Sequence, residues 1–331
     1  MMLQVYPLLL AVVLVVSAVV TPPLLQAAAP LLMRVPRAAV TLMVGTLAVW
    51  LMTAGGLSLT LAWLFAGPII LPEPIAAVCQ RCLDAVRPYS LIAPLESGIP
   101  TALLLGLPAF GVVVLAMIGL YRGIRRYRVT TRLGRGIAAG AEPARMHGHD
   151  LLVVDDERPV VFSLPRRVGG IVVSRGLLET LDDDELHAVV CHECAHLRQH
   201  HHLVVSALEG VVKPLRWLPI AKAIADAVPH YLEIAADTSA KHRTGTPALA
   251  SALLKLGDMR VAAPVAGQLS PMLHAAGPER IRFLCEPGDT TVARVPIAAL
   301  TAQLVAFAIA TTVTHAPYVL VVLGGCQQFP S

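Results

Sequence analysis

Four long stretches that carry almost no charge limit what this chain can fold into more than any other feature. They cover residues 3–20, 40–71, 99–120 and 295–323. A helix needs about 20 apolar residues to cross the hydrocarbon core of a bilayer. We therefore expect about four transmembrane helices, three of them before the middle of the chain and one near its end.

The charged residues are concentrated between these stretches. Only 15% of the 331 residues are charged, against about 25% in an average soluble domain. The pattern predicts an N-terminal membrane region over 1–121, a water-facing domain over 122–294, and a C-terminal transmembrane helix with a short tail over 295–331. The first stretch could also be a signal peptide, because residues 27–29 are three alanines. A signal peptide, however, requires Lys or Arg before its apolar run, and none is present here.

A basic block follows the third stretch and sets the expected orientation. Its members are Arg122, Arg125, Arg126, Arg128, Arg132 and Arg135. Arg and Lys close to spans stay on the cytoplasmic side. This places the domain 122–294 in the cytoplasm of a multi-pass cell-membrane protein, the loop 72–98 outside, and the connection 21–39 inside. The block can also hold anionic membrane lipid. Because it lies beside a span rather than along a helix face, direct nucleic acid binding is not expected.

The water-facing domain shows both strand and helix patterns. Short apolar runs at 151–154, 160–162 and 171–174 predict strands. Residues 177–201 have helical periodicity, and the acidic residues 182–185 suit the first turn of a helix. The segment 203–227 is apolar with interspersed charges, which predicts helices packed in the domain or lying on the membrane surface. Pro229 is expected to start another helix over 231–243. The predicted fold class is α+β, mainly helical with a small sheet.

His192, Glu193 and His196 form an H-E-x-x-H motif inside the predicted helix. Residues four apart lie on one helix face, so both imidazoles point toward one place. Two imidazoles and a third protein ligand, with one position open to water, make a catalytic zinc site. Glu193 would act as general base toward that water. The alternative is a pair of structural histidines, but burying these groups in an apolar helix without a function is costly.

We expect the third ligand to come from another helix, because a helix diverges from a metal that two of its residues already hold. Glu233 lies on a later predicted helix with Asp237 one turn further on. We expect Glu233 to bind the metal and Asp237 to accept a hydrogen bond from a ligand imidazole. A solvated face is the alternative for this pair. His200 is a weaker ligand candidate, and we interpret the run His200, His201, His202 as a solvated helix end.

H-E-x-x-H followed by E-x-x-A-D resembles the gluzincin membrane peptidases, over about residues 150–285. The resemblance implies Zn²⁺ as cofactor, with His192, His196 and Glu233 as ligands and Glu193 as base. The H-P-x4-R element of the HtpX-like branch has a partial counterpart in His274 and Arg280, with Ala275 in place of the proline. These two residues could steady Asp237 or a developing oxyanion, or could form a surface turn and helix cap.

Two branches of these peptidases imply different protein substrates. The BlaR/MecR branch has three spans before the peptidase domain and one after it, as expected here, and implies cleavage of a winged-helix repressor of the BlaI/MecI kind. Only residues 324–331 follow the last span, so a penicillin-binding sensor domain and direct β-lactam acylation are not expected. The HtpX branch implies quality control of membrane proteins. A third alternative is a non-catalytic zinc-binding receptor, but a purely structural site has no use for Glu193.

Three weaker features complete the sequence-based expectations. Residues 171–174 are our candidate for an edge strand that pairs with an extended substrate. Cys79 and Cys82 form a lone C-x-x-C that could make a disulfide or sense redox state. His315 and Pro317 predict a kink near the outer end of the last span.

Overall fold

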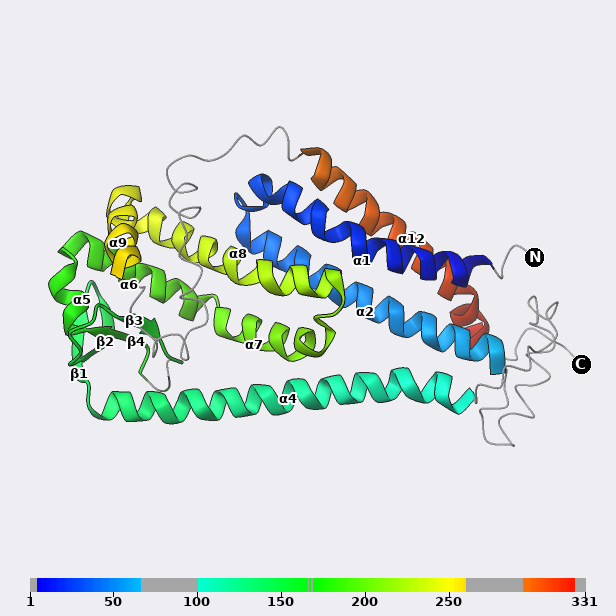
Figure 1. Ribbon diagram of the computed structural model, residues 1–331, viewed down its shortest axis with the longest axis horizontal. Helices are drawn as coiled ribbons and strands as arrows, with labels where there is room; N and C mark the ends of the chain where they lie inside the picture. The colour runs from blue at the N-terminus through cyan, green and yellow to red at the C-terminus, as the bar shows by residue number, and fades with distance from the viewer. Residues whose placement is uncertain (1–4, 67–100, 166, 168, 260–293, 325–331) are drawn as a thin grey trace, which may run out of the picture.

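The computed structural model describes residues 5–66, 101–165, 167, 169–259 and 294–324. The described part is elongated (Figure 1). The sheet and the helices α5, α6 and α9 lie at one end, while α1, α2 and α12 extend toward the other. Cys79, Cys82, His274 and Arg280 lie outside the described residues, so the expectations for them stay predictions.

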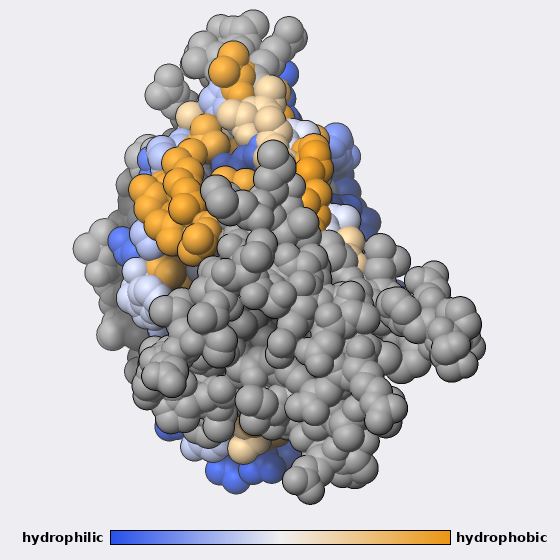
Figure 2. Space-filling model, turned by 90° about the vertical axis from the view of Figure 1, so that its right-hand side faces the viewer, coloured by the Kyte–Doolittle hydropathy of each residue, from blue (hydrophilic) through white to orange (hydrophobic). Residues whose placement is uncertain are grey.

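Three of the described helices are long and apolar enough to cross a membrane. These are α1 (Val5–Leu32), α2 (Pro36–Ala66) and α12 (Arg294–Gly324), with candidate spans at Pro7–Leu32, Pro36–Ser58 and Val295–Ala316. They overlap the predicted stretches 3–20, 40–71 and 295–323. Seen end-on, the described residues at the far end of these helices are largely hydrophobic (Figure 2). The third predicted stretch, 99–120, overlaps the start of α4 and stays a prediction as a membrane span.

The expected loop 21–39 is wrong, because α1 and α2 occupy most of it. Helix α1 continues through Pro22, Pro23 and Pro30 to Leu32, and α2 begins at Pro36. Proline is tolerated in an apolar helix when neighbouring helices pack around it, and α1 packs against α12, α2 and α8. Pro36 suits the first position of a helix, where its missing N–H has no partner to lose. The connection is therefore only residues 33–35.

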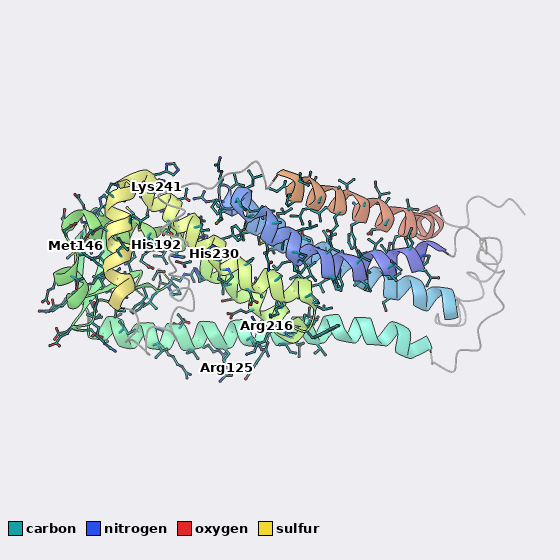
Figure 3. The ribbon with its side chains drawn as sticks, turned by 45° about the horizontal axis from the view of Figure 1, so that its top comes forward. Arg125, Met146, His192, Arg216, His230 and Lys241 are labelled. Atoms are coloured by element: carbon teal, nitrogen blue, oxygen red, sulfur yellow. The ribbon has the colours of Figure 1, made fainter. Side chains whose placement is uncertain are left out.

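Helix α4 (Thr101–Ala139) joins the third predicted span to the sheet without a break. Its 39 residues correspond to about 58 Å at 1.5 Å per residue. The basic block is therefore helical, and Arg125 lies on the outward side of α4 (Figure 3). Helix α4 also packs against α2 and α7. The predicted domain boundary at 121/122 falls inside this helix and stays a prediction.

The sheet has four strands in the order β1-β2-β4-β3. They are β1 (Glu142–Met146), β2 (His149–Val154), β3 (Val161–Ser163) and β4 (Ile171–Ser174). The pair β2/β4 is parallel, and the other two pairs are antiparallel. The three predicted strands are confirmed. The expectation that 171–174 forms an edge is wrong, because β4 lies between β2 and β3 and all four of its residues are buried.

The helices of the sheet end differ from prediction at two boundaries. The predicted helix 177–201 is divided into α5 (Arg175–Thr180) and α6 (Asp183–Arg198). It breaks there because Asp182 caps α6: its side chain accepts a hydrogen bond from the N–H of Glu185, whose carboxylate accepts one from the N–H of Asp182. This is a capping box.

Pro229 lies inside α8 (Pro219–Thr244) and does not start a helix. A proline inside a helix costs about 3 kcal/mol. The packing of Ile224, Val228 and Leu232 against α1 and α2 offsets that cost. Helix α8 is consequently long enough to extend from the membrane-type helices to the sheet end.

Two large hydrophobic cores stand out among the described residues. One joins α7 (His201–Val212) and the first half of α8 to α1 and α2, through residues such as Val205, Ile220 and Met43. The other joins the sheet to α5, α6 and α9 (Thr246–Met259), through Leu151, Val173 and Val190. The predicted helices within 203–227 are thus confirmed, with the short 3-10 helix η2 (Lys213–Leu215) between α7 and α8. The candidate site lies where α6 and α8 cross, between the two cores.

Candidate metal centre

Helix α6 carries the H-E-x-x-H motif on a segment that is fixed at its start. Besides the capping box, Glu185 accepts hydrogen bonds from Ser251 and Lys255 of α9, each at 2.6 Å. The apolar face of α6 packs on the sheet through Leu186, Val189 and Val190. His192, Glu193 and His196 follow in its second half, and Glu193 and His196 are buried. The site therefore rests on a helix that several independent contacts hold in place.

Helix α8 brings Glu233 to the two histidines. The Glu233 Oε2 atom lies 3.5 Å from His192 Nε2, and Glu233 Oε1 lies 3.4 Å from His196 Nε2. The two Nε2 atoms are 3.0 Å apart. Among the described residues, these three side chains are the group of His, Cys, Asp and Glu whose ligand atoms converge closely enough to hold a metal. Figure 3 shows His192 at the crossing of α6 and α8.

The donor set fits a small four-coordinate cation. Bonds of about 2.0–2.1 Å at tetrahedral angles place neighbouring ligand atoms about 3.4 Å apart. The three separations of 3.0, 3.4 and 3.5 Å are close to that value. With three protein ligands, one position remains for water or substrate, as in catalytic rather than structural sites.

Asp237 holds the ring of His192. The Asp237 Oδ1 atom lies 2.9 Å from His192 Nδ1, on the side of the ring that faces away from Glu233. Burial lowers the pKa of His192, but Asp237 and Glu233 outweigh burial and raise the pKa to about 10. Two buried carboxylates therefore favour a positive charge at this place. Either a proton or a metal cation can supply it. A proton on Nδ1 leaves Nε2 free to bind the metal.

His201 is a partner of the site that sequence reasoning missed. Its side chain is 2% exposed, and its Nδ1 lies 2.8 Å from Nδ1 of His196. Burial and the neighbouring His196 lower the pKa of His201 to about 3, so the ring is neutral. The expectation of a solvated helix end is therefore wrong for His201, although His200 and His202 are exposed. The chain turns at His200, which has a left-handed backbone conformation, and so directs His201 back toward α6.

The two cysteines of α6 are buried and form no disulfide with another described residue. Cys191 packs between α6, α8 and α9, and Cys194 packs against the sheet. Both pack as small apolar groups. Cys194 Sγ also lies 3.2 Å from His149 Nδ1 on β2. His315 of α12 packs against Gly56 of α2, and the helix continues past it to Gly324.

Two histidines and a glutamate from crossed helices, with a glutamate beside the first histidine, form a metal centre of the kind found in metallopeptidases, in a protein with membrane-type helices. Residues 130–256 match the family described as Peptidase family M48. The matched segment runs from the end of α4 to α9 and includes all three residues of the candidate metal centre.

One curated relative is described as "Protease HtpX homolog", from Acidiphilium cryptum (strain JF-5). It is 29% identical over 155 residues, which cover 37% of this chain and 52% of the relative. The chain thus spans about half the length of the curated relative that it matches. No solved structure matches the chain. The relative lies on the HtpX side of the expected resemblance and does not test regulation of the BlaR/MecR kind.

Proposed function

We propose that the protein is a membrane-embedded, zinc-dependent endopeptidase that hydrolyses peptide bonds of a protein substrate. The observation that carries this proposal is the convergence of His192, His196 and Glu233 beside Glu193. Two imidazole nitrogens and one carboxylate oxygen are a donor set that zinc prefers. His192, His196 and Glu233 would hold the ion, and Asp237 would keep the His192 ring in the correct orientation.

The chain's own residues then perform the proton transfers. A zinc ion held by these residues would polarise the scissile carbonyl and would lower the pKa of water toward neutral pH. Glu193 accepts a proton from the attacking water and donates it to the leaving amine nitrogen as the C–N bond breaks. Because Glu193 is buried beside His192, bulk water does not compete for its carboxylate.

An extended substrate is better placed on the edge strand β3 than on β4, because β4 lies inside the sheet. Among the described residues, β3 pairs with β4 on one side, and it contacts α6. A peptide that adds to its other side would gain backbone hydrogen bonds independent of side-chain sequence. We propose that this edge binds the substrate backbone next to the metal centre.

We further propose that the protein is a multi-pass protein of the cell membrane with its peptidase domain in the cytoplasm. The arginines along α4 support this orientation under the positive-inside rule. Membrane lipid would then contact α1, α2 and α12, which expose apolar residues such as Val15, Met52 and Ile309.

Two substrate classes follow from the two branches of the resemblance. Helices α1, α2 and α4 precede the sheet and α12 follows it, an order that favours a regulatory peptidase acting on a winged-helix repressor of the BlaI/MecI kind. The curated relative's description favours an HtpX-like role in membrane-protein quality control. The first substrate would be a soluble cytoplasmic protein, whereas the second would be a damaged membrane protein.

The test compares fragments in cells that carry the intact protein, Glu193→Gln or Glu179→Gln. Glu179 is an exposed glutamate of α5 and serves as the matched control. We expect at least one fragment to disappear in Glu193→Gln only, while bound zinc is retained. A soluble repressor among the lost fragments supports the regulatory role, and membrane-protein fragments support quality control. Unchanged fragments with retained zinc would favour the non-catalytic receptor.

A further inference from the structure

We propose that His201 is a positioning residue for the metal ligand His196, and that Gln199 and Arg37 extend this contact to the start of α2. Four side chains would then form one hydrogen-bonded chain from the membrane-type helices to the metal centre. This inference rests on the proposed metal centre, and it adds a route by which the membrane helices influence it.

The contacts of the chain are continuous. His196 Nδ1 and His201 Nδ1 are 2.8 Å apart, and His201 Nε2 lies 3.1 Å from Gln199 Oε1. The same oxygen accepts a hydrogen bond of 3.0 Å from Arg37 Nε. Arg37 lies in the first turn of α2, so the corner between α6 and α7 contacts the start of α2.

The proton positions along the chain follow from one requirement. His196 Nε2 faces Glu233 and His192, so it must be unprotonated to bind a metal, and the proton lies on Nδ1. His196 Nδ1–H therefore donates to Nδ1 of His201. The neutral ring of His201 then carries its proton on Nε2 and donates it to Gln199 Oε1. An oxygen is required at that place, because the Arg37 guanidinium only donates.

The two metal ligands thus have different supports. His192 is held by the carboxylate of Asp237 on α8, within the site itself. His196 is held by a neutral ring whose far side is fixed by a residue of α2. A shift of the α1–α2 hairpin relative to the α6–α7 corner would loosen His196 and leave His192 unchanged. Mutation of a residue that hydrogen-bonds a ligand histidine typically lowers metal affinity 10–100-fold.

The experiment uses the full chain in detergent and measures the zinc dissociation constant by competition with a chelator. We expect His201→Ala to weaken zinc 10–100-fold, and the exposed neighbour His202→Ala to change it less than about 2-fold. His201→Asn should restore much of the loss, because its amide oxygen can accept from His196 Nδ1. A positioning role also predicts altered visible absorption bands of the Co²⁺-substituted His201→Ala protein.

Arg37→Ala tests the end of the hydrogen-bonded chain at the membrane-type helices. As a control, Arg34→Ala removes the same charge three residues earlier. We expect Arg37→Ala to weaken zinc several-fold and Arg34→Ala to leave it unchanged. The double variant Arg37→Ala/His201→Ala should bind zinc no more weakly than His201→Ala, because both changes interrupt one chain. If His201→Ala does not fold, Gln199→Leu takes its place in this cycle.

The possible failures are distinguishable. Equal zinc affinity in wild type, His201→Ala and Arg37→Ala, or fully additive losses in the double variant, would overturn the inference and leave the proposed function intact. A wild-type protein that binds no zinc would overturn the proposed function and this inference with it.

Discussion

At the scale of single residues, the partner of each ligand ring decides how firmly the metal is held. Asp237 offers a carboxylate, and together with Glu233 it outweighs burial and raises the pKa of His192. His201 is neutral and offers a weaker electrostatic contribution. The two ligand rings therefore rest on acceptors of different charge.

We expect Asp237→Asn to weaken zinc binding by about 10–100-fold, because the asparagine keeps the shape but not the charge that favours His192 Nδ1–H. Asp226→Asn is the control, since Asp226 is exposed on the same helix and pairs with Arg216. Chelator competition on both variants measures the effect. Equal affinities in the two variants would show that the Asp237 charge does not support the site.

The sequence was sufficient to predict the residues that converge at the site but not all of their partners. H-E-x-x-H and E-x-x-A-D have spacings that a regular helix converts directly into shared faces, so His192, His196 and Glu233 could be named in advance. His201 could not, because its position depends on the left-handed residue His200. A run of three histidines after a helix resembles a solvated end, and only the turn reveals which one is buried.

At the scale of elements, α6 is stabilised through Glu185. This carboxylate is buried, closes the capping box, and binds Ser251 and Lys255 of α9. Burial alone would raise the pKa of Glu185, but the hydrogen bonds from Lys255, Ser251 and the Asp182 N–H outweigh it and hold the pKa below its usual value.

This shift predicts a loss of stability in acid. A group whose pKa is lower in the folded than in the unfolded state contributes fully above its unfolded pKa, about 4.3 for Glu. The contribution is lost as the pH falls below that value. Glu185→Gln should lower the unfolding temperature at pH 7 and flatten the decrease of that temperature as the pH falls from about 5 to about 2, measured against Glu179→Gln. If the unfolding temperature of Glu185→Gln depended on pH as strongly as that of wild type, Glu185 would not be the group responsible for the loss of stability in acid.

Gly176 lies at the start of α5, where the backbone of another segment leaves no room for a side chain. A methyl group there would overlap the backbone carbonyl of Glu157, which cannot move aside as a flexible side chain could. We expect Gly176→Ala to destabilise the protein by about 1–3 kcal/mol. Gly257→Ala in α9 is the control, because its added methyl meets no atom within 4 Å. Thermal unfolding compares the two, and equal unfolding temperatures would be inconsistent with the close approach.

Element boundaries were predicted least well, and each error has a physical cause. Strand β1 has a Glu-Pro-Ala-Arg-Met sequence without an apolar pattern, and it forms because β2 offers it an edge. Pro229 and the prolines of α1 remain inside helices because packing on several sides exceeds their local cost. The interior position of β4 depends on the order of the strands in the sheet. Local sequence patterns predict strands but not their order.

At the scale of the whole molecule, α4 and α8 both connect the membrane-type helices to the sheet end. The sheet end is therefore expected to keep a fixed orientation to the membrane. Fusions truncated after residue 98 should carry an active extracytoplasmic reporter, and fusions truncated after residue 150 an active cytoplasmic one. The opposite pattern would reverse the proposed orientation without affecting the chemistry.

The metal content of the purified full-length chain tests the central claim most directly. We predict about one zinc per chain in wild type and in Glu193→Gln, and clearly less in Glu233→Gln after dialysis against the same chelator. Glu193→Gln should nevertheless lose hydrolysis by at least about 100-fold. A wild-type chain without bound metal, or a Glu233→Gln chain that retains zinc as firmly as wild type, would contradict the account.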